Sequence, residues 1–306
     1  MRVAITGGTG FIGGLCAALL RERGDEPVLL SRRTGGAVDD PGALSEAFAG
    51  AGAVIHAAGI NREIGDQTFE RVHVRGTECV LAAARAAGVR RVVLVSFLRA
   101  RPGTGSPYHE SKWRAEELCR AALDLETVVV KPGVVYGRGD HMLDHLSRAF
   151  HTFPVFGLVG FRPRLLRPLA GEDLARVLVA AVRDPRLSGR TFSVLGPETL
   201  TLEEAVRRVA RATGRDPLFV PLPILVHRAI AAIAERTMKV PLVSRAQLRI
   251  LREGITEAAG GPIEELPEDL RPRRPFDEAS IRGGLPPPEG FRRADLLCSN
   301  AKGRPS

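Results

Sequence analysis

A glycine-rich turn near the N-terminus sets the first limit on the fold. An apolar stretch, V-A-I (3–5), runs into glycines at positions 7, 8, 10 and 13, and a helical pattern follows through Leu20. Glycines let the backbone turn tightly and approach a pyrophosphate, and the N–H groups that open the next helix point at the anion. A second apolar stretch at 27–30 completes a βαβ unit. The pattern therefore predicts a dinucleotide-binding cradle rather than a glycine turn without a ligand.

Strand and helix patterns continue to alternate after this unit. We expect strands at 53–59 and 92–96, and helices at 11–23, 43–49 and 69–87. In a chain of 306 residues, this alternation predicts an α/β fold of the Rossmann type. It would have a doubly wound parallel sheet and a smaller C-terminal substrate region.

The bulk composition disfavours several classes of protein. Lys and Arg outnumber Asp and Glu by 44 to 35, a net charge of +9, but the basic residues are scattered and only 5% of residues are aromatic. A basic, solvated surface is therefore favoured over a nucleic-acid site. The four cysteines are far apart, with no C-x-x-C pair and no histidine at metal-ligand spacing. We expect reduced thiols and no metal site.

No segment has the pattern of a membrane span or a secretory leader. Met1 leads directly into the first strand, and the longest apolar run, 221–234, is interrupted by His227 and Arg228. This run is too short to cross a bilayer and is interpreted as a wall or packing face of the substrate region. We expect a cytoplasmic protein with a small-molecule substrate, no nucleic acid and no transmembrane segment. Peripheral membrane contact is disfavoured, and the sequence leaves the oligomeric state open.

The end of the second strand bears on the choice of cofactor. Ser31, Arg32 and Arg33 follow this strand directly. Folds that prefer NAD place an acid here for the ribose 2′-OH, whereas a hydroxyl and a planar, permanently charged guanidinium suit a 2′-phosphate. The sequence therefore favours NADP(H) over NAD(H). The alternative is a solvated pair of arginines at a strand end.

Tyr108 and Lys112 form the candidate catalytic pair, because on a helix they are one turn apart and share a face. An ammonium beside a phenol, helped by the positive nicotinamide, lowers the tyrosine pKa from about 10 and makes the phenol a usable acid or base. Y-x-x-x-K alone is common, but its place after the Rossmann strands makes it specific. Ser96, at the end of a strand, is the candidate third member.

Together these motifs resemble the short-chain dehydrogenase/reductase superfamily, in its extended or atypical branch with the epimerase/dehydratase type of domain. The matching stretches are T-G-G-T-G-F-I-G (6–13), H-A-A-G (56–59), V-R-G-T (74–77), Y-H-E-S-K (108–112) and K-P-G-V-V-Y-G-R-G-D (131–140). The stretch from 59 to 74 further resembles bacterial relatives of the NADPH-binding accessory subunit of respiratory complex I. The resemblance spans roughly residues 1–250 and is strongest in the first 140.

The resemblance implies a set of site residues. Tyr108 would transfer the proton, and Lys112 would hold the nicotinamide ribose. Leu98 stands where catalytic members carry Ser or Thr, which leaves Ser96 as the substitute, and Ala37 stands where many members have an Asp that contacts adenine. The cofactor-binding residues would be Gly7, Thr9, Gly10, Phe11, Ile12, Gly13, Ser31, Arg32, Arg33, Ala57, Ala58, Gly59, Lys112, Pro132, Val134 and Val135.

Three functions are compatible with these residues. The favoured one is an oxidoreductase that exchanges hydride between NADP(H) and a carbonyl or alcohol substrate, with Tyr108 as acid or base. The second is a non-catalytic NADPH-binding protein for redox sensing or assembly, and the third is a nucleotide-sugar epimerase or dehydratase.

The expected domain organisation follows the changes in pattern along the chain. We expect an NADP(H)-binding Rossmann domain at 1–150, to which 168–195 returns, and a substrate region mainly at 151–260. The segment 261–306 is rich in Pro, Gly and Arg, which bury little apolar surface, so we expect a loosely held, partly disordered tail.

Overall fold

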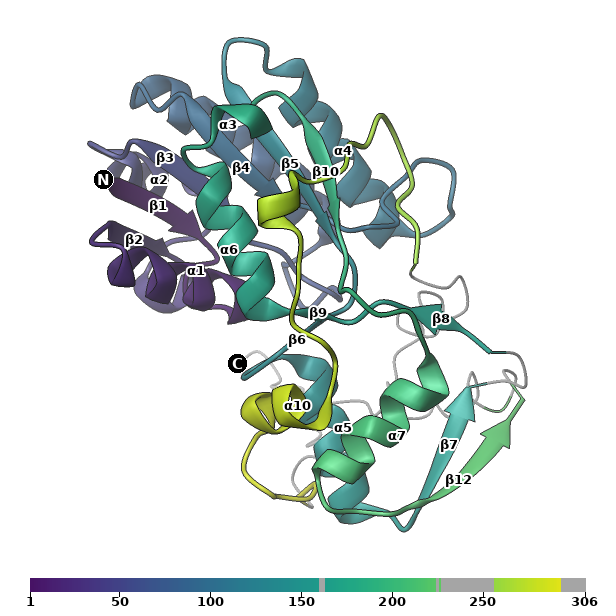
Figure 1. Cartoon of the computed structure of the whole chain (residues 1–306). Coiled ribbons are helices and arrows are strands. Elements are labelled where there is room, and N and C mark those ends of the chain that lie inside the picture. The colour runs from purple at the N-terminus through teal and green to yellow at the C-terminus, as the bar shows by residue number, and fades with distance from the viewer. Residues whose placement is uncertain (160–162, 224–225, 227–255, 293–306) are drawn as a thin grey trace, which may run out of the picture. The chain divides into compact units, whose positions relative to one another are not determined.

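The computed structural model describes residues 1–159, 163–223, 226 and 256–292, and the chain divides into two compact units. The first unit comprises Met1–Val135, Arg167–Glu198 and Ile255–Pro275. The second comprises Tyr136–Leu166, Thr199–Gly254 and Phe276–Ser306. Figure 1 shows the elements of both units, and each unit is described by itself.

A six-stranded parallel sheet with the order β10-β5-β4-β3-β1-β2 forms the centre of the first unit. The chain runs from β1 outward to β2 and then returns to build the other side from β3, so the direction of winding reverses between β1 and β3. Ligands of such sheets bind beyond the carboxyl ends of the strands at this reversal. The predicted doubly wound parallel sheet is thus confirmed. Its strands are β1 (Arg2–Thr6), β2 (Glu26–Leu30), β3 (Ala53–His56), β4 (Arg91–Val95), β5 (Glu126–Pro132) and β10 (Thr191–Val194).

Helices cover both faces of this sheet (Figure 1). Val3 and Ile5 of β1 are buried in the core beneath α1 and α6, whereas Ala4 between them is buried in the core beneath α2, α3 and α4. Because the strands are buried on both faces, they form continuous apolar runs rather than an alternating pattern. The helices are α1 (Phe11–Glu22), α2 (Pro41–Phe48), α3 (Gly76–Ala86), α4 (Pro107–Ala121) and α6 (Gly171–Ala181), with the shorter turns η1 (Arg32–Thr34), η2 (Glu70–Arg75), η3 (Pro185–Leu187) and η4 (Glu268–Leu270).

The second unit combines helices with short strand pairs. The rings of Phe150, Phe156 and Phe219 pack together, with centroids 5.2, 6.1 and 6.3 Å apart. Its strands pair as β7 (Val155–Val159) with β12 (Leu218–Leu222) and β8 (Leu165–Leu166) with β11 (Leu200–Thr201). Of the two remaining short strands, β9 (Leu169–Ala170) belongs to the first unit, and β6 (Val135–Tyr136) spans the point where the chain leaves that unit. The helices are α5 (His141–Thr152), α7 (Leu202–Ala212) and α10 (Glu278–Gly284).

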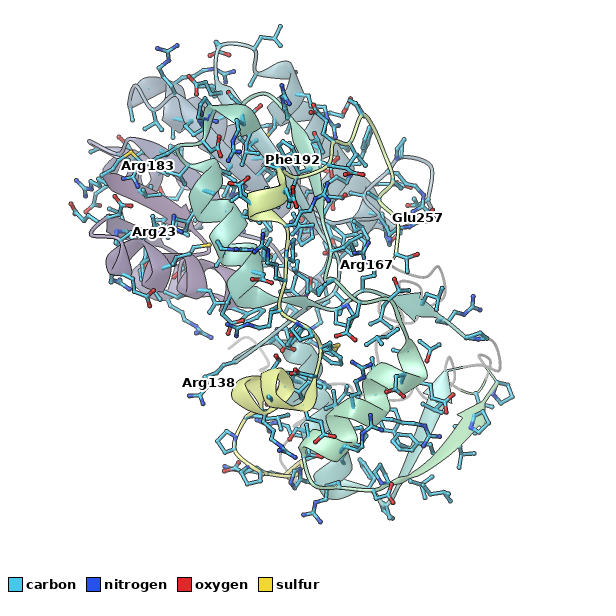
Figure 2. The ribbon with its side chains drawn as sticks, in the orientation of Figure 1. Arg23, Arg138, Arg167, Arg183, Phe192 and Glu257 are labelled. Carbon is cyan, nitrogen blue, oxygen red and sulfur yellow. The ribbon has the colours of Figure 1, made fainter. Side chains whose placement is uncertain are left out.

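The observed division differs from the expected boundaries in two places. The N-terminal stretch of the first unit ends at Val135 rather than at 150, because α5 belongs to the second unit and packs on α7 there. The segment expected to begin a loose tail is also packed. Leu266 and Leu270 are buried in the same core as Phe192 of β10, which is labelled in Figure 2. These two leucines therefore attach the part of the segment before residue 276 to the first unit, despite its Pro and Arg content.

Two expectations fall outside the described residues. Most of the apolar run at 221–234 lies there, and so does the tail beyond residue 292. Among the helices that the structure describes, none combines the length and apolar character that a membrane crossing requires.

Candidate functional site

The turn after β1 is built on glycines that the fold itself requires. Gly7 has φ +70°, and a Cβ there would lie 2.8 Å from the Ala58 backbone. A Cβ on Gly13 would lie 2.3 Å from the Gly7 carbonyl oxygen. These two glycines let β1, the end of β3 and α1 approach one another closely. Their presence therefore has a packing reason and does not by itself indicate a ligand.

Gly10 is different, because the protein gives it little packing reason. It is exposed, and a Cβ there would meet only the Gly7 carbonyl oxygen, at 3.1 Å. It opens α1, which has no side-chain cap and no acidic residue in its first turn. The N–H groups of Phe11, Ile12 and Gly13 begin the helix here, and such groups attract an anion. This open, uncapped helix start fits a bound pyrophosphate.

The end of β2 is joined to this turn by a hydrogen bond. The Thr9 hydroxyl donates to the Ser31 hydroxyl at 2.9 Å, and Ser31 in turn accepts from the Thr34 N–H and caps η1. Arg32 and Arg33 are exposed, and within the described part of the chain neither guanidinium forms an ion pair. The structure thus brings the hydroxyls of Thr9 and Ser31 together, with two uncompensated cations next to them.

The end of β3 connects the cradle to α4. The Ala57 N–H donates to the Thr6 carbonyl at 3.1 Å, and the Ala58 N–H donates to the Thr6 hydroxyl at 3.4 Å. At Gly59, a Cβ would lie 3.2 Å from Lys112 Nζ. The predicted residues at 57–59 therefore lie between the glycine turn and the lysine of the candidate pair.

Lys112 is buried, and its Nζ donates to the Val95 carbonyl at 3.0 Å. Burial lowers the pKa of Lys112 to about 8, and the charge of Glu116 opposes this shift. The ammonium is thus fixed at the carboxyl end of β4, beside Gly59. Burial thus brings the pKa of this ammonium closer to neutral pH than that of an exposed lysine.

Tyr108 lies one turn before Lys112 and is half-buried among aromatic rings. Its ring packs against Phe69, His73, Phe97 and His109, with centroids 5.3 to 5.8 Å away. Burial raises the pKa of Tyr108 above its usual value. The sequence interpretation expected a lowered pKa. That expectation included the charge of a bound nicotinamide. By themselves, the aromatic surroundings disfavour the phenolate, and within the described residues no hydrogen bond joins the phenol to Lys112.

Ser96 is not brought to Tyr108. Its hydroxyl donates to Glu116, a fully buried carboxylate on α4 that also binds Lys131 Nζ at 2.6 Å and Arg120 Nη2 at 2.7 Å. We call these four residues the Glu116 cluster. The Ser96 hydroxyl therefore satisfies a buried charge rather than orienting the phenol.

The remaining predicted cofactor-binding residues lie at the end of β5 and directly after it. Pro132 accepts a hydrogen bond from the Leu98 N–H at 2.9 Å, and Val134 accepts one from the Leu169 N–H at 2.8 Å. Val135 packs against the core beneath α1 and α6, and Leu98 is fully buried. Backbone hydrogen bonds thus join this stretch to Leu98 on one side and to Leu169 on the other.

Four buried polar residues escaped the sequence interpretation: His56, His73, Thr77 and Ser111. They hydrogen-bond to one another, and burial lowers the pKa of His56 to about 3 and that of His73 to about 2. The stretches 56–59, 74–77 and 108–112 had been noted only for their resemblance to a family. The sequence signal that could have revealed these buried residues was the presence of His56 and His73 within otherwise apolar patterns.

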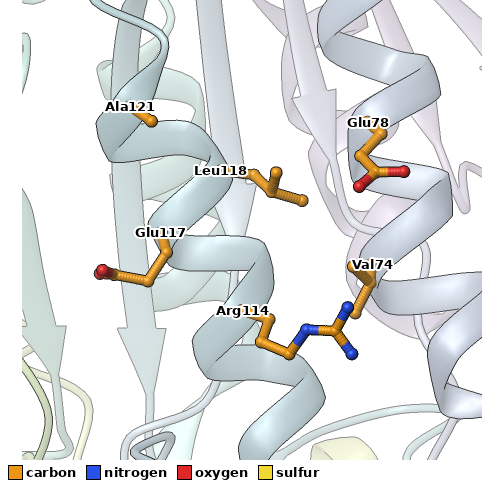
Figure 3. Close-up of a pocket in the computed structure, with 6 residues that line it drawn as sticks. All are labelled: Val74, Glu78, Arg114, Glu117, Leu118 and Ala121. Carbon is orange, nitrogen blue, oxygen red and sulfur yellow. The ribbon is translucent and has the colours of Figure 1, made fainter.

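A groove of about 320 Å³ lies apart from these residues, between α3 and α4. Figure 3 shows Arg114 and Leu118 of α4 pointing toward Val74 and Glu78. None of the candidate site residues lines it.

Comparison with known proteins agrees with the fold. A relative from Caulobacter vibrioides named ceramide reductase is 34% identical over 72% of this chain and 73% of its own length. An alpha subcomplex subunit 9 of mitochondrial NADH dehydrogenase from Mus musculus is 29% identical over 63% of this chain. The chain spans about half of that subunit, 51%. The solved structure of MoeE5 in complex with UDP-glucose and NAD has the same fold, with a TM-score of 0.66 at 19% identity, covering 93% of this chain and 97% of that one.

The family match covers the whole cradle and most of the first unit. The sequence profile of the NAD dependent epimerase/dehydratase family matches residues 3–194, which include the glycine turn, the β3 end and the Tyr108 helix. With this match and the 34% identical relative, the chain belongs to the NAD dependent epimerase/dehydratase family.

Proposed function

We propose that the protein is an NADP(H)-dependent reductase of a carbonyl group, with Tyr108 as the proton donor. The observation that carries the proposal is the position of Lys112 Nζ, which lies beside Gly59 at the end of β3 while Tyr108 precedes it by one turn of α4. The phenol and the ammonium therefore belong to one turn of α4, and the ammonium of this turn lies beside Gly59. A cofactor seated there would supply or accept the hydride.

The residues that would hold the cofactor divide into two groups. The uncapped start of α1 at Gly10 suits the pyrophosphate. Ser31, Arg32 and Arg33 suit a 2′-phosphate, because the two exposed guanidinia offer charge-assisted hydrogen bonds and no described acid competes for them. This second group supports a preference for NADP(H) over NAD(H).

Tyr108 would give its proton to the carbonyl oxygen, where a reduction needs a donor. A phenol is protonated at neutral pH, but burial raises the pKa of Tyr108 and so weakens it as an acid, which means that nearby positive charge must stabilise the phenolate. Lys112 would hold the nicotinamide ribose and stabilise the phenolate that forms. We leave Ser96 out of the mechanism, because its hydroxyl donates to Glu116.

The substrate class is inferred from the surroundings of Tyr108 and from the relatives. Phe69 and Phe97 make these surroundings apolar, and the 34% identical relative is named a ceramide reductase. We therefore propose a carbonyl on an amphipathic, ceramide-like lipid as the substrate. A nucleotide-sugar reaction is supported by the epimerase/dehydratase family match and by the fold shared with a UDP-glucose complex. A non-catalytic role is supported by the complex I subunits, at lower identity.

The test is the Tyr108→Phe variant, with Tyr136→Phe as the matched control because it removes the chain's other phenol. NADPH oxidation is measured with ketone derivatives of ceramide, simple ketones, aldehydes, quinones and UDP-sugars. We expect Tyr108→Phe to lower kcat by about 10²–10⁴-fold while the Kd for NADPH stays unchanged. Full turnover in this variant would exclude the phenol as the acid. Tight NADPH binding by the wild type without turnover of any substrate would favour the non-catalytic function.

A further inference from the structure

A buried chain of hydrogen bonds runs from the cradle to the helix that carries Tyr108. It begins at the Thr6 hydroxyl, which accepts from the Ala58 N–H and contacts His56 Nδ1 at 2.6 Å. His56 Nε2 contacts the Thr77 hydroxyl at 3.1 Å, and this hydroxyl donates to the His73 carbonyl at 2.6 Å. The chain thus crosses from the strand ends of β1 and β3 to η2.

His73 carries the connection onward through its ring. Its Nε2 accepts from the Ile60 N–H at 3.1 Å, and its Nδ1 contacts the Ser111 hydroxyl at 2.9 Å. That hydroxyl donates to the Tyr108 carbonyl at 3.0 Å. The imidazole therefore touches the turn after β3 with one nitrogen and the Tyr108 turn of α4 with the other.

Only one protonation pattern satisfies both ends of this ring. Nε2 faces the Ile60 N–H and must accept, so the ring proton lies on Nδ1. Nδ1 donates this proton to the Ser111 hydroxyl, which in turn donates to the backbone carbonyl of Tyr108. A protonated imidazole would oppose the Ile60 N–H with a second donor. Burial and the charge of Lys112 agree with this pattern, since both lower the pKa of His73.

The local backbone places the ring between these partners. η2 (Glu70–Arg75) is a π-helical stretch that leads into α3, and His73 within it is buried. Such wider turns are rare and cluster at functional sites. From here the ring also packs edge-on against Tyr108, at 5.8 Å between centroids, and lies close to Gly59.

We propose that His73 is a positioning residue that holds the turn after β3 and the Tyr108 turn of α4 in register, one through each ring nitrogen. The inference rests on the proposed function, because the first turn borders the cofactor cradle and the second carries the acid. The Ile60 hydrogen bond would govern cofactor affinity. The Ser111 hydrogen bond would govern the placement of the phenol and therefore turnover.

Two variants separate the ring nitrogens. The amide nitrogen of Asn lies at the distance of Nδ1 from the backbone, so His73→Asn keeps a donor for Ser111 and loses the acceptor for Ile60. The longer Gln reaches the position of Nε2, so His73→Gln keeps an acceptor for Ile60 and loses the donor for Ser111. Ser111→Ala removes the second connection from the other side. His151→Gln, a change of a partly buried histidine in the second unit, is the control.

The expected results are opposite for the two variants. His73→Asn should weaken NADPH binding about 3- to 10-fold with kcat nearly unchanged, since one neutral hydrogen bond is lost. His73→Gln and Ser111→Ala should lower kcat about 10- to 100-fold with NADPH affinity unchanged, since a small displacement of the acid is costly. Equal effects of Asn and Gln on both quantities would overturn the proposal.

The readouts also distinguish this inference from the proposed function. If Tyr108→Phe is inactive but His73→Gln has wild-type kcat, the inference fails and the function stands. If no substrate is turned over, NADPH titration of the Asn and Gln variants still tests the Ile60 connection. Nitrogen NMR of the histidine rings at neutral pH adds a direct check. His73 must carry its proton on Nδ1, and a proton on Nε2 would refute the assignment.

Discussion

Three glycines of the same turn are expected to respond differently to a single methyl group. At Gly14, nothing lies within 4 Å of an added Cβ. At Gly10, only the Gly7 carbonyl oxygen lies nearby, at 3.1 Å, and φ is −79°, which alanine adopts readily. At Gly13, the same oxygen lies at 2.3 Å and the Gly8 Cα at 2.8 Å. The three positions therefore separate the needs of the ligand from the needs of the fold.

The magnitudes follow from these distances. Gly14→Ala should stabilise the protein by about 0.5–1 kcal/mol, because alanine loses less backbone entropy in a helix, and should leave NADPH affinity unchanged. Gly10→Ala should cost about 1 kcal/mol or less in stability, as the loss of a glycine N-cap does. It should weaken NADPH binding about 10- to 150-fold, since a displaced phosphate loses a charge-assisted hydrogen bond of about 1.5–3 kcal/mol. Gly13→Ala should lower the stability of the protein by at least about 1–3 kcal/mol, because the added methyl group overlaps the backbone of Gly7 and Gly8.

Calorimetric titration with NADPH and urea unfolding of the same samples measure both quantities. The informative comparison is Gly10→Ala with Gly14→Ala, since both add one methyl group at exposed positions of the same turn and helix. If the two variants bind NADPH equally well, the pyrophosphate does not approach Gly10, and the assignment of the cradle is wrong.

Two further predictions concern charge. NADPH should bind more tightly than NADH, and Arg32→Ala should remove most of this preference, about 1.5–3 kcal/mol. The control Arg90→Ala removes an equal charge before β4 and should leave the preference unchanged. Equal affinity of the wild type for both cofactors, measured by calorimetry, would contradict this prediction. Glu116→Gln should destabilise the protein by about 3–5 kcal/mol, because it leaves Lys131 buried without a counter-charge. The double change Glu116→Leu with Lys131→Met should cost less, and a double variant less stable than the single one by urea unfolding would count against this reasoning.

The strand and helix order of the first unit was predictable from local pattern. A glycine turn between an apolar strand and a helix has few other structural uses, and strands buried on both faces leave unmistakable apolar runs. The grouping of Thr9 with Ser31 and of Lys112 with Gly59 also follows from this topology, because consecutive parallel strands end at the same edge of the sheet.

The electrostatics of the site were not predictable in the same way. The spacing of Tyr108 and Lys112 gives a shared helix face but not the aromatic rings that enclose the phenol, which come from 69, 73 and 97. A π-helical turn has no clear sequence signal, so the place of His73 was hidden. The partner of Ser96 was not predictable, because Glu116 lies 20 residues further along the chain and no local pattern marks this glutamate of α4 as buried.

The Glu116 cluster connects the stability of α4 with its proposed chemistry. Glu116 lies one turn after Lys112, and its charge raises the pKa of that lysine while burial lowers it. Lys131, Arg120 and the Ser96 hydroxyl all donate hydrogen bonds to the buried carboxylate of Glu116. The cluster therefore acts on the ammonium without touching the cofactor cradle. Ser96, which has no part in the proposed proton transfer, therefore still contributes to the site, since it donates to the carboxylate whose charge raises the pKa of Lys112.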